Sequence, residues 1–185
     1  EHQFRVGVEG GYVVPDQGGT VDVSGSSFVV LNTRLKQSPA QADVRAVSSI
    51  TAAASLLNRA PLNVFDNANL PVDVAKGRVE ATGDLAFIMK DKLPVEEVKF
   101  DVTGRLKMVE STQLLPGKTL RGTLEVNATD QEVEIFGPGS IGAVPAVARW
   151  HAKLGKPGQV GSGKSTVSGQ VELSQGVVDE FNIGL

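Results

Sequence analysis

The chain has 185 residues, of which 41% are hydrophobic and 21% are charged, as in an ordinary globular domain. Its formal net charge of −3 argues against a nucleic-acid-binding protein, because that function needs a clustered basic surface. Cysteine is absent, which excludes a disulfide framework, a thiolate nucleophile and a zinc ribbon. The sequence shows neither a signal peptide nor an apolar stretch of about 18 residues that could span a membrane.

The N-terminal part of the chain predicts short strands separated by turns. The predicted strands are 4–8, 11–14, 20–24, 27–32 and 42–48. One helix is predicted after them, because Ser48 or Ser49 can cap a segment from Ile50 to Asn58 that has one apolar face and stops before Pro61. This helix is too short and too rich in Ala to form a core by itself, so we interpret it as a plug or lid on a sheet.

Two long segments in the middle of the chain alternate strictly between apolar and polar residues. They run from Gly77 to Met89 and from Val98 to Met108, within predicted strands 77–90 and 95–109, and a short strand is predicted before them over 72–75. Strict alternation predicts an extended strand with one apolar face and one polar face that is exposed to solvent. At about 3.3 Å per residue the second segment spans roughly 36 Å, about twice the usual length of a strand.

The C-terminal part continues the same pattern. The predicted strands are 118–128, 131–136, 143–153, 166–174 and 176–184. Turns are predicted at Leu115–Gly117 and Gly137–Gly139, and a flexible Gly/Ser loop at 155–166. We interpret residues 1–185 as a single β-rich domain that is a fragment of a larger protein, with 166–185 as the start of the next repeat. The predicted fold class is all-β: a long, curved, mainly antiparallel sheet, either a groove or an open sandwich, with one short α-helix.

A weak internal repeat follows the pattern apolar, acidic, apolar, Ser or Thr, Gly. It occurs in Val21–Gly25, Val79–Gly83 and Phe100–Gly104. In each copy the Gly occupies one of the alternate positions that are otherwise apolar. A missing side chain there lets a strand bend or a backbone approach closely. Two interpretations stay open: the glycines curl the sheet, or they mark strand kinks in a sandwich.

Several residues match catalytic or binding motifs without the context that those motifs require. Gly158–Ser165 fits the phosphate-loop pattern G-x-x-x-x-G-K-[ST], but the residues after it alternate like a strand, whereas phosphate binding needs a helix there. His2 and His151 are not spaced in the sequence like a pair of metal ligands. His151 lies on the polar side of its predicted strand, with Arg149 and Lys153. Carboxylate pairs that meet only in space are not visible in a sequence. We therefore predict no catalytic residue, no metal, no cofactor and no nucleotide, and a protein that is not an enzyme.

The order of elements resembles a known family. The segments that carry the resemblance are Leu56–Leu62, Gly77–Ala81, Leu93-Pro94 before the long strand, Gly122–Val126, and Glu134–Ala146 with its turn of the form G-x-G-x-(I/L)-x-G-x-P. Over roughly residues 4 to 155 the chain resembles the large AsmA-like bacterial envelope proteins, in particular the repeat domain of unknown function in their long members. The resemblance implies the periplasmic part of a mostly β protein that is anchored in the inner membrane, similar to bridge-like lipid-transfer proteins. The family has no catalytic residues to carry over.

The expected function is a non-catalytic segment with an apolar β-groove for phospholipid transport or outer-membrane maintenance. Phospholipid acyl chains are the expected partner, other envelope proteins are compatible with this role, and nucleic acid is not expected. The candidate groove lining is Val79, Ala81, Leu85, Phe87, Val98, Phe100, Val102, Leu106 and Met108. The alternative is a structural or assembly scaffold of the cell envelope with a closed core and no ligand. A closed sandwich should fully bury the apolar residues of the alternating strands, whereas a groove should leave part of their surface accessible to solvent.

Overall fold

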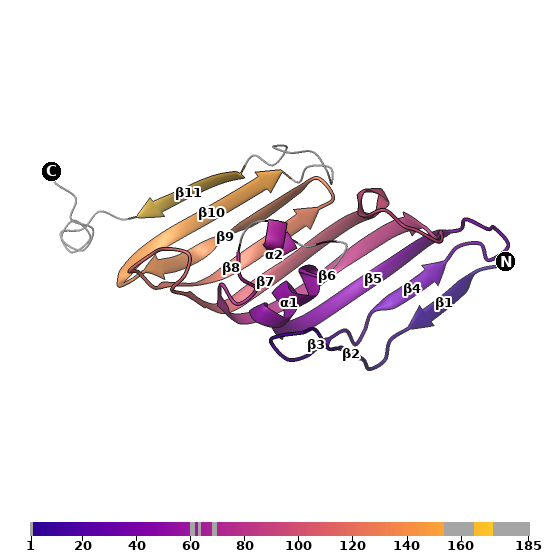
Figure 1. The fold of residues 1–185 in the computed structure, drawn as a ribbon, viewed down its shortest axis with the longest axis horizontal. Helices are drawn as coiled ribbons and strands as arrows, with labels where there is room; N and C mark the ends of the chain where they lie inside the picture. Colours follow the sequence, from indigo (N-terminus) through magenta and orange to yellow (C-terminus); the bar gives the residue numbers. More distant parts are fainter. Residues whose placement is uncertain (1, 60–61, 63, 68–69, 154–164, 172–185) are drawn as a thin grey trace.

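The computed structural model describes residues 2–59, 62, 64–67, 70–153 and 165–171. Eleven strands form one antiparallel sheet, and the described residues add two short α-helices and one 3-10 turn (Figure 1). In the described residues the sheet is a single open layer. The predicted all-β fold is confirmed.

The strands follow one another across the sheet almost in sequence order. The main path is β1 (Phe4–Gly7), β4 (Ser27–Val30), β5 (Pro39–Ser49), β6 (Lys76–Ile88), β7 (Lys99–Ser111), β8 (Leu120–Thr129), β9 (Glu132–Ile141), β10 (Val144–Lys153) and β11 (Ser165–Val171). A small hairpin of β2 (Tyr12–Val13) and β3 (Val21–Asp22) joins the sheet beside β5, where Asp22 pairs with Val47. From β5 onward the chain is a meander, and among the described strands β1 and β11 lie at the two edges of the sheet (Figure 1).

The helix α1 (Ile50–Leu57) begins directly where β5 ends. Ser49 is its N-cap: the hydroxyl oxygen accepts a hydrogen bond from the backbone N–H of Ala52 at 3.0 Å. The same hydroxyl donates to the carbonyl oxygen of Gly18 at 2.7 Å, which ties the loop before β3 to the helix. The predicted helix is therefore confirmed, whereas the second helix, α2 (Val64–Asn67), was not predicted.

The helix α1 packs over one end of β5 and β6 (Figure 1). Ile50 Cδ1 lies only 2.9 Å from the position that a Cβ on Gly77, at the start of β6, would occupy. Ala52 and Ala54 are buried, and Gly18 fits against Ala52 so tightly that a Cβ there would lie 2.2 Å from the Ala52 backbone nitrogen. We refer to α1, α2 and the loop from Pro15 to Thr20 as the helical cap.

The structure corrects two local predictions. Residues 72–75 were predicted as a strand but form a turn before β6. The turn predicted at Gly137–Gly139 lies inside β9, where no pair joins Gly137 or Pro138 to β8, while the ladder continues on either side. Proline has no N–H to donate, so this gap in the ladder matches its position.

Few of the described side chains are buried, and none of the predicted lining residues is among them. The buried hydrophobic residues are Val21, Val29, Val30, Ala40, Ala52, Ala54, Val74, Ala75 and Val144. They lie in the helical cap or near strand ends rather than in the middle of β6, β7 or β8. Within the described part of the chain, no second sheet covers the long strands, so the fold lacks the central core of a sandwich.

Candidate functional site

The structure brings most of the predicted lining residues together on one face of β6 and β7. Paired positions across these strands are Val79 with Leu106, Ala81 with Gly104, Gly83 with Val102, and Leu85 with Phe100. The predicted lining residues of these pairs, and Phe87 at the end of β6, are half-buried. We call the side of the sheet that carries these residues the apolar face.

Two of the predicted residues do not belong to this arrangement. Val98 precedes β7, because residues 95–97 form a 3-10 turn and the strand begins at Lys99. Met108 lies at a bulge, where the pairing of β7 with β8 shifts register between Leu106 and Val109. Its φ of 52° is in the left-handed region, and its side chain is 74% exposed. The strict alternation that the sequence predicted therefore ends at Lys107 because a bulge inserts one residue.

The apolar face continues far beyond the two strands on which it was predicted. Register across β5 to β11 aligns one row of apolar residues: Ala46, Ala81, Gly104, Val126, Ile135, Trp150 and Val167. At about 4.8 Å between neighbouring strands, this row spans roughly 29 Å perpendicular to the strands. The lining predicted from the sequence did not include β8 to β11, although Trp150, which alternates with the polar Arg149 and His151, indicated an apolar side there.

Glycines on the apolar face allow neighbouring backbones to approach closely. A Cβ on Gly83 would lie 2.5 Å from the carbonyl oxygen of Asp101, and a Cβ on Gly139 would lie 2.2 Å from that of Arg121. Neither position can hold a larger residue without a shift of the neighbouring strand. Gly83 and Gly104 also leave the middle of the apolar face without large side chains, between Val79 and Leu106 on one side and Leu85 and Phe100 on the other.

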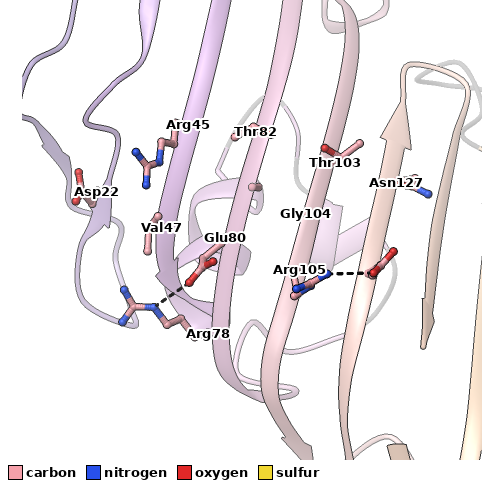
Figure 2. Close-up of a pocket in the computed structure, with 12 residues that line it drawn as sticks. Asp22, Arg45, Val47, Arg78, Glu80, Thr82, Thr103, Gly104, Arg105 and Asn127 are labelled. Carbon is pink, nitrogen blue, oxygen red and sulfur yellow. Dashed lines mark hydrogen bonds and ion pairs between the residues drawn. The ribbon is translucent and has the colours of Figure 1, made fainter. Parts of the chain in front are cut away.

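The opposite face of the sheet is polar and contains a hollow of about 690 Å³ that was not predicted (Figure 2). Its lining comes from β3 and β5 to β8: Asp22, Arg45, Val47, Arg78, Glu80, Ala81, Thr82, Thr103, Gly104, Arg105, Glu125 and Asn127. Figure 2 shows that charged side chains of both signs surround it. We call this side of the sheet the polar face.

Ion pairs between strands organise the polar face. Lys107 Nζ lies 2.7 Å from Glu80 Oε2, and Arg105 Nη2 lies 3.3 Å from Glu125 Oε1 (Figure 2 shows the second pair). The hydrogen bond from Lys107 is the main reason why the pKa of Glu80 is lowered from its ordinary value. Hydrogen bonds from Ser24 similarly lower the pKa of Asp22. All these side chains are at least partly exposed, so each pair contributes little stability alone.

Three carboxylates also line up on the polar face. Asp43 pairs with Asp84 across β5 and β6, and Asp84 pairs with Asp101 across β6 and β7. Like charges directly opposite one another destabilise a sheet, so this row is not explained by stability. Among the described residues, no group of His, Asp or Glu side chains is arranged to hold a metal ion.

The remaining motif residues have structural roles in the described residues. Ser165 begins β11, which pairs antiparallel with β10, so a strand follows the phosphate-loop match as predicted. Residues 158–164 of that match lie outside the described residues, as do most of the predicted loop 155–166 and the predicted strand 176–184. His151 Nε2 lies 3.0 Å from Glu132 Oε2 on the neighbouring strand.

Comparisons with known proteins identify no relative: the chain matches no protein family, no curated protein and no solved structure. In the described part of the chain, neither helix has the length and apolar character needed to cross a membrane. The class of protein that the geometry defines is thus a single-layer antiparallel sheet with one apolar face, one polar face and a helical cap at one end.

Proposed function

We propose that this chain is a non-catalytic segment of an AsmA-like envelope protein, and that its apolar face carries phospholipid acyl chains. The observation that supports this proposal is the row of apolar residues across seven strands, from Ala46 to Val167, without a covering sheet in the described residues. A groove that conducts lipid needs a continuous apolar surface perpendicular to its strands, because an acyl chain in transit would otherwise have to cross a polar interruption.

The chemistry of the apolar face suits flexible hydrocarbon. Removing a methylene group from water is favourable by about 0.8 kcal/mol, so an acyl chain along several half-buried strands gains a substantial free energy. Small residues such as Ala81, Gly83 and Gly104 leave room between the larger Leu85 and Leu106. The headgroup would remain in water, because an unpaired phosphate is costly to bury.

The proposed location follows from the resemblance to the AsmA-like family. In this proposal the chain lies in the periplasm, as part of a protein anchored in the inner membrane, and contributes to lipid transport or outer-membrane maintenance. Other envelope proteins would bind outside the apolar face. Neither nucleotide nor nucleic acid has a role.

A scaffold is the second candidate, and one observation favours it. The outer edge of β11 is unpaired in the described residues, and Val167 on this strand is 77% exposed. Unpaired edge strands invite another strand to pair with them. In a scaffold, a protein partner would cover both this edge and the apolar face, leaving no room for lipid.

Photo-crosslinking in bacterial cells distinguishes the two functions. A photoreactive residue replaces Phe87, Phe100 or Leu106 on the apolar face, with Lys99 and Arg105 on the polar face as matched controls. The lipid proposal predicts lipid adducts at the first three positions and none at the controls. Protein adducts without lipid at the first three positions would instead favour the scaffold.

A further inference from the structure

The two ends of the strands β5 and β6 differ in how they are covered. At one end, α1 follows β5 directly and packs on β5 and β6. At the other end, the loops 31–38 and 89–98 meet, and the backbone N–H of Met89 donates to the carbonyl oxygen of Ser38 at 2.8 Å. No α-helix of the described residues covers this second end, which we call the open rim (Figure 1).

The open rim combines exposed aliphatic side chains with an excess of positive charge. Leu31, Leu35 and Met89 are 40%, 52% and 40% exposed. The loop 31–38 contains Arg34 and Lys36 and no acidic residue, and both cations are exposed. No ion pair within the described residues involves either of them, so their charges are available to a ligand.

The second loop of the rim contributes no net positive charge. Lys90 pairs with Glu97, and Lys92 has Asp91 and Glu96 as neighbours in the sequence. The excess positive charge of the rim is therefore confined to the loop 31–38.

The capped end lacks this excess of positive charge. Arg59 there is already paired with Asp16 at 2.9 Å. Asp66 and Asp73, which have no cation within ion-pair distance among the described residues, offset the exposed Lys76 at the start of β6. An anion is thus more favourable at the open rim than at the cap, and at either end salt screens charges that lie more than about 8 Å away.

We propose that a phospholipid lies on the apolar face with its phosphate at the open rim, on Arg34 and Lys36, and its acyl chains directed along β5 and β6 toward α1. This inference rests on the proposed function and adds an orientation and a ligand class to it, namely lipids with an anionic headgroup. From Phe87 to Val79, β6 spans about 26 Å at about 3.3 Å per residue. One leaflet of a bilayer has a hydrocarbon thickness of about 15 Å, so the chains fit between the rim and the cap.

The test compares three ligands on the purified chain. They are a short-chain phosphatidylglycerol kept below its micelle concentration, a diacylglycerol with the same chains, and glycerol phosphate, which has the headgroup but no chains. The variant is Arg34→Gln/Lys36→Gln, and the control is Lys76→Gln, an exposed cation at the start of β6, near the cap. Calorimetric titration measures the dissociation constant of each ligand.

The proposal predicts that the double variant binds phosphatidylglycerol about three- to tenfold more weakly, as expected for two exposed charge contacts. Diacylglycerol should bind the native chain and both variants equally, and Lys76→Gln should change nothing. Unchanged phosphatidylglycerol binding by the double variant, with both lipids bound, overturns the headgroup site but not the proposed function. Absence of binding for both lipids overturns the proposed function. Glycerol phosphate binding as tightly as the whole lipid overturns the proposal in favour of a free phosphate site.

Discussion

Gly139 is the residue at which the sheet is least tolerant of a side chain. A Cβ there would lie 2.2 Å from the carbonyl oxygen of Arg121, which belongs to β8 and cannot move without moving the strand. We expect Gly139→Ala to lower the free energy of unfolding by about 1–3 kcal/mol, the range of overpacking substitutions. Gly7→Ala on the edge strand β1 is the control, because nothing lies within 4 Å of its Cβ position, and it should change stability by less than about 0.5 kcal/mol. Equal urea midpoints for the two variants would contradict the close approach of β8 and β9.

The ion pair between Lys107 and Glu80 makes a pH-dependent contribution. The pKa of Glu80 is lowered from its ordinary value of 4.5, chiefly by the hydrogen bond from Lys107. A lowered pKa of a carboxyl group stabilises the fold above its unfolded-state value, and this stabilisation is lost as the pH falls through the folded-state value.

Lys107→Gln should therefore be less stable than the native chain at pH 7, and the difference should shrink as the pH falls below 4.5. Urea denaturation at pH 7 and at pH 3 measures this change. Lys76→Gln provides the baseline, because it removes a cation that forms no ion pair with any other described residue. A Lys107→Gln deficit that is the same at both pH values would show that the charge of Glu80 plays no part.

At the scale of elements, Ser49 couples the end of β5, the start of α1 and the loop before β3. Its hydroxyl accepts from the Ala52 N–H and donates to the Gly18 carbonyl. Ser49→Ala should lower the free energy of unfolding by about 1 kcal/mol, the usual loss for an N-cap. The control is Thr51→Ala in the same helix, which improves helix propensity and should be neutral or slightly stabilising. If both variants unfold at the same urea concentration, the cap hydrogen bonds do not hold the helix on the sheet.

The elements that could be predicted from sequence are those whose signal is local. Alternation indicated β6 and β7, and a Ser before an Ala-rich amphipathic segment indicated α1. The predictions fail where pairing with a neighbouring strand, rather than the local sequence, determines the conformation. Gly137–Gly139 has the composition of a turn, yet pairing with β10 keeps it in β9. Met108 continues the alternation in the sequence, but the bulge is visible only in the register of β7 with β6 and β8.

The candidate site was predictable in part for the same reason. Alternation sorts the side chains of one strand onto two faces, so residues such as Leu85 and Phe100 could be placed on a common face. The extent of the apolar face across β8 to β11 depends on strand order and register, which no single strand encodes. The hollow on the polar face is likewise built from β3 and β5 to β8 together, and its ion pairs join residues far apart in the sequence.

At the scale of the whole molecule, the central claim is that the apolar face contacts acyl chains. Trp150 is the only tryptophan of the chain, and it lies in the apolar row between Ile135 and Val167, half-buried. Its fluorescence therefore reports contact with the β10 part of that face, four strands away from the proposed lipid position on β6, so a tryptophan on β6 is the closer probe. A bromine atom on an acyl chain quenches tryptophan emission only at close range, which makes the contact directly measurable.

The measurement titrates the purified chain with a phospholipid whose acyl chains carry bromine, beside the same lipid without bromine. Two variants of the chain are compared. Trp150→Phe/Phe87→Trp carries the fluorophore on the apolar face of β6, and Trp150→Phe/Thr103→Trp carries it on the exposed polar face of β7. The account predicts bromine-dependent quenching in the first variant and little or none in the second. Bound lipid that leaves the tryptophan at position 87 unquenched, or that quenches both variants equally, would contradict an acyl-chain site on the apolar face.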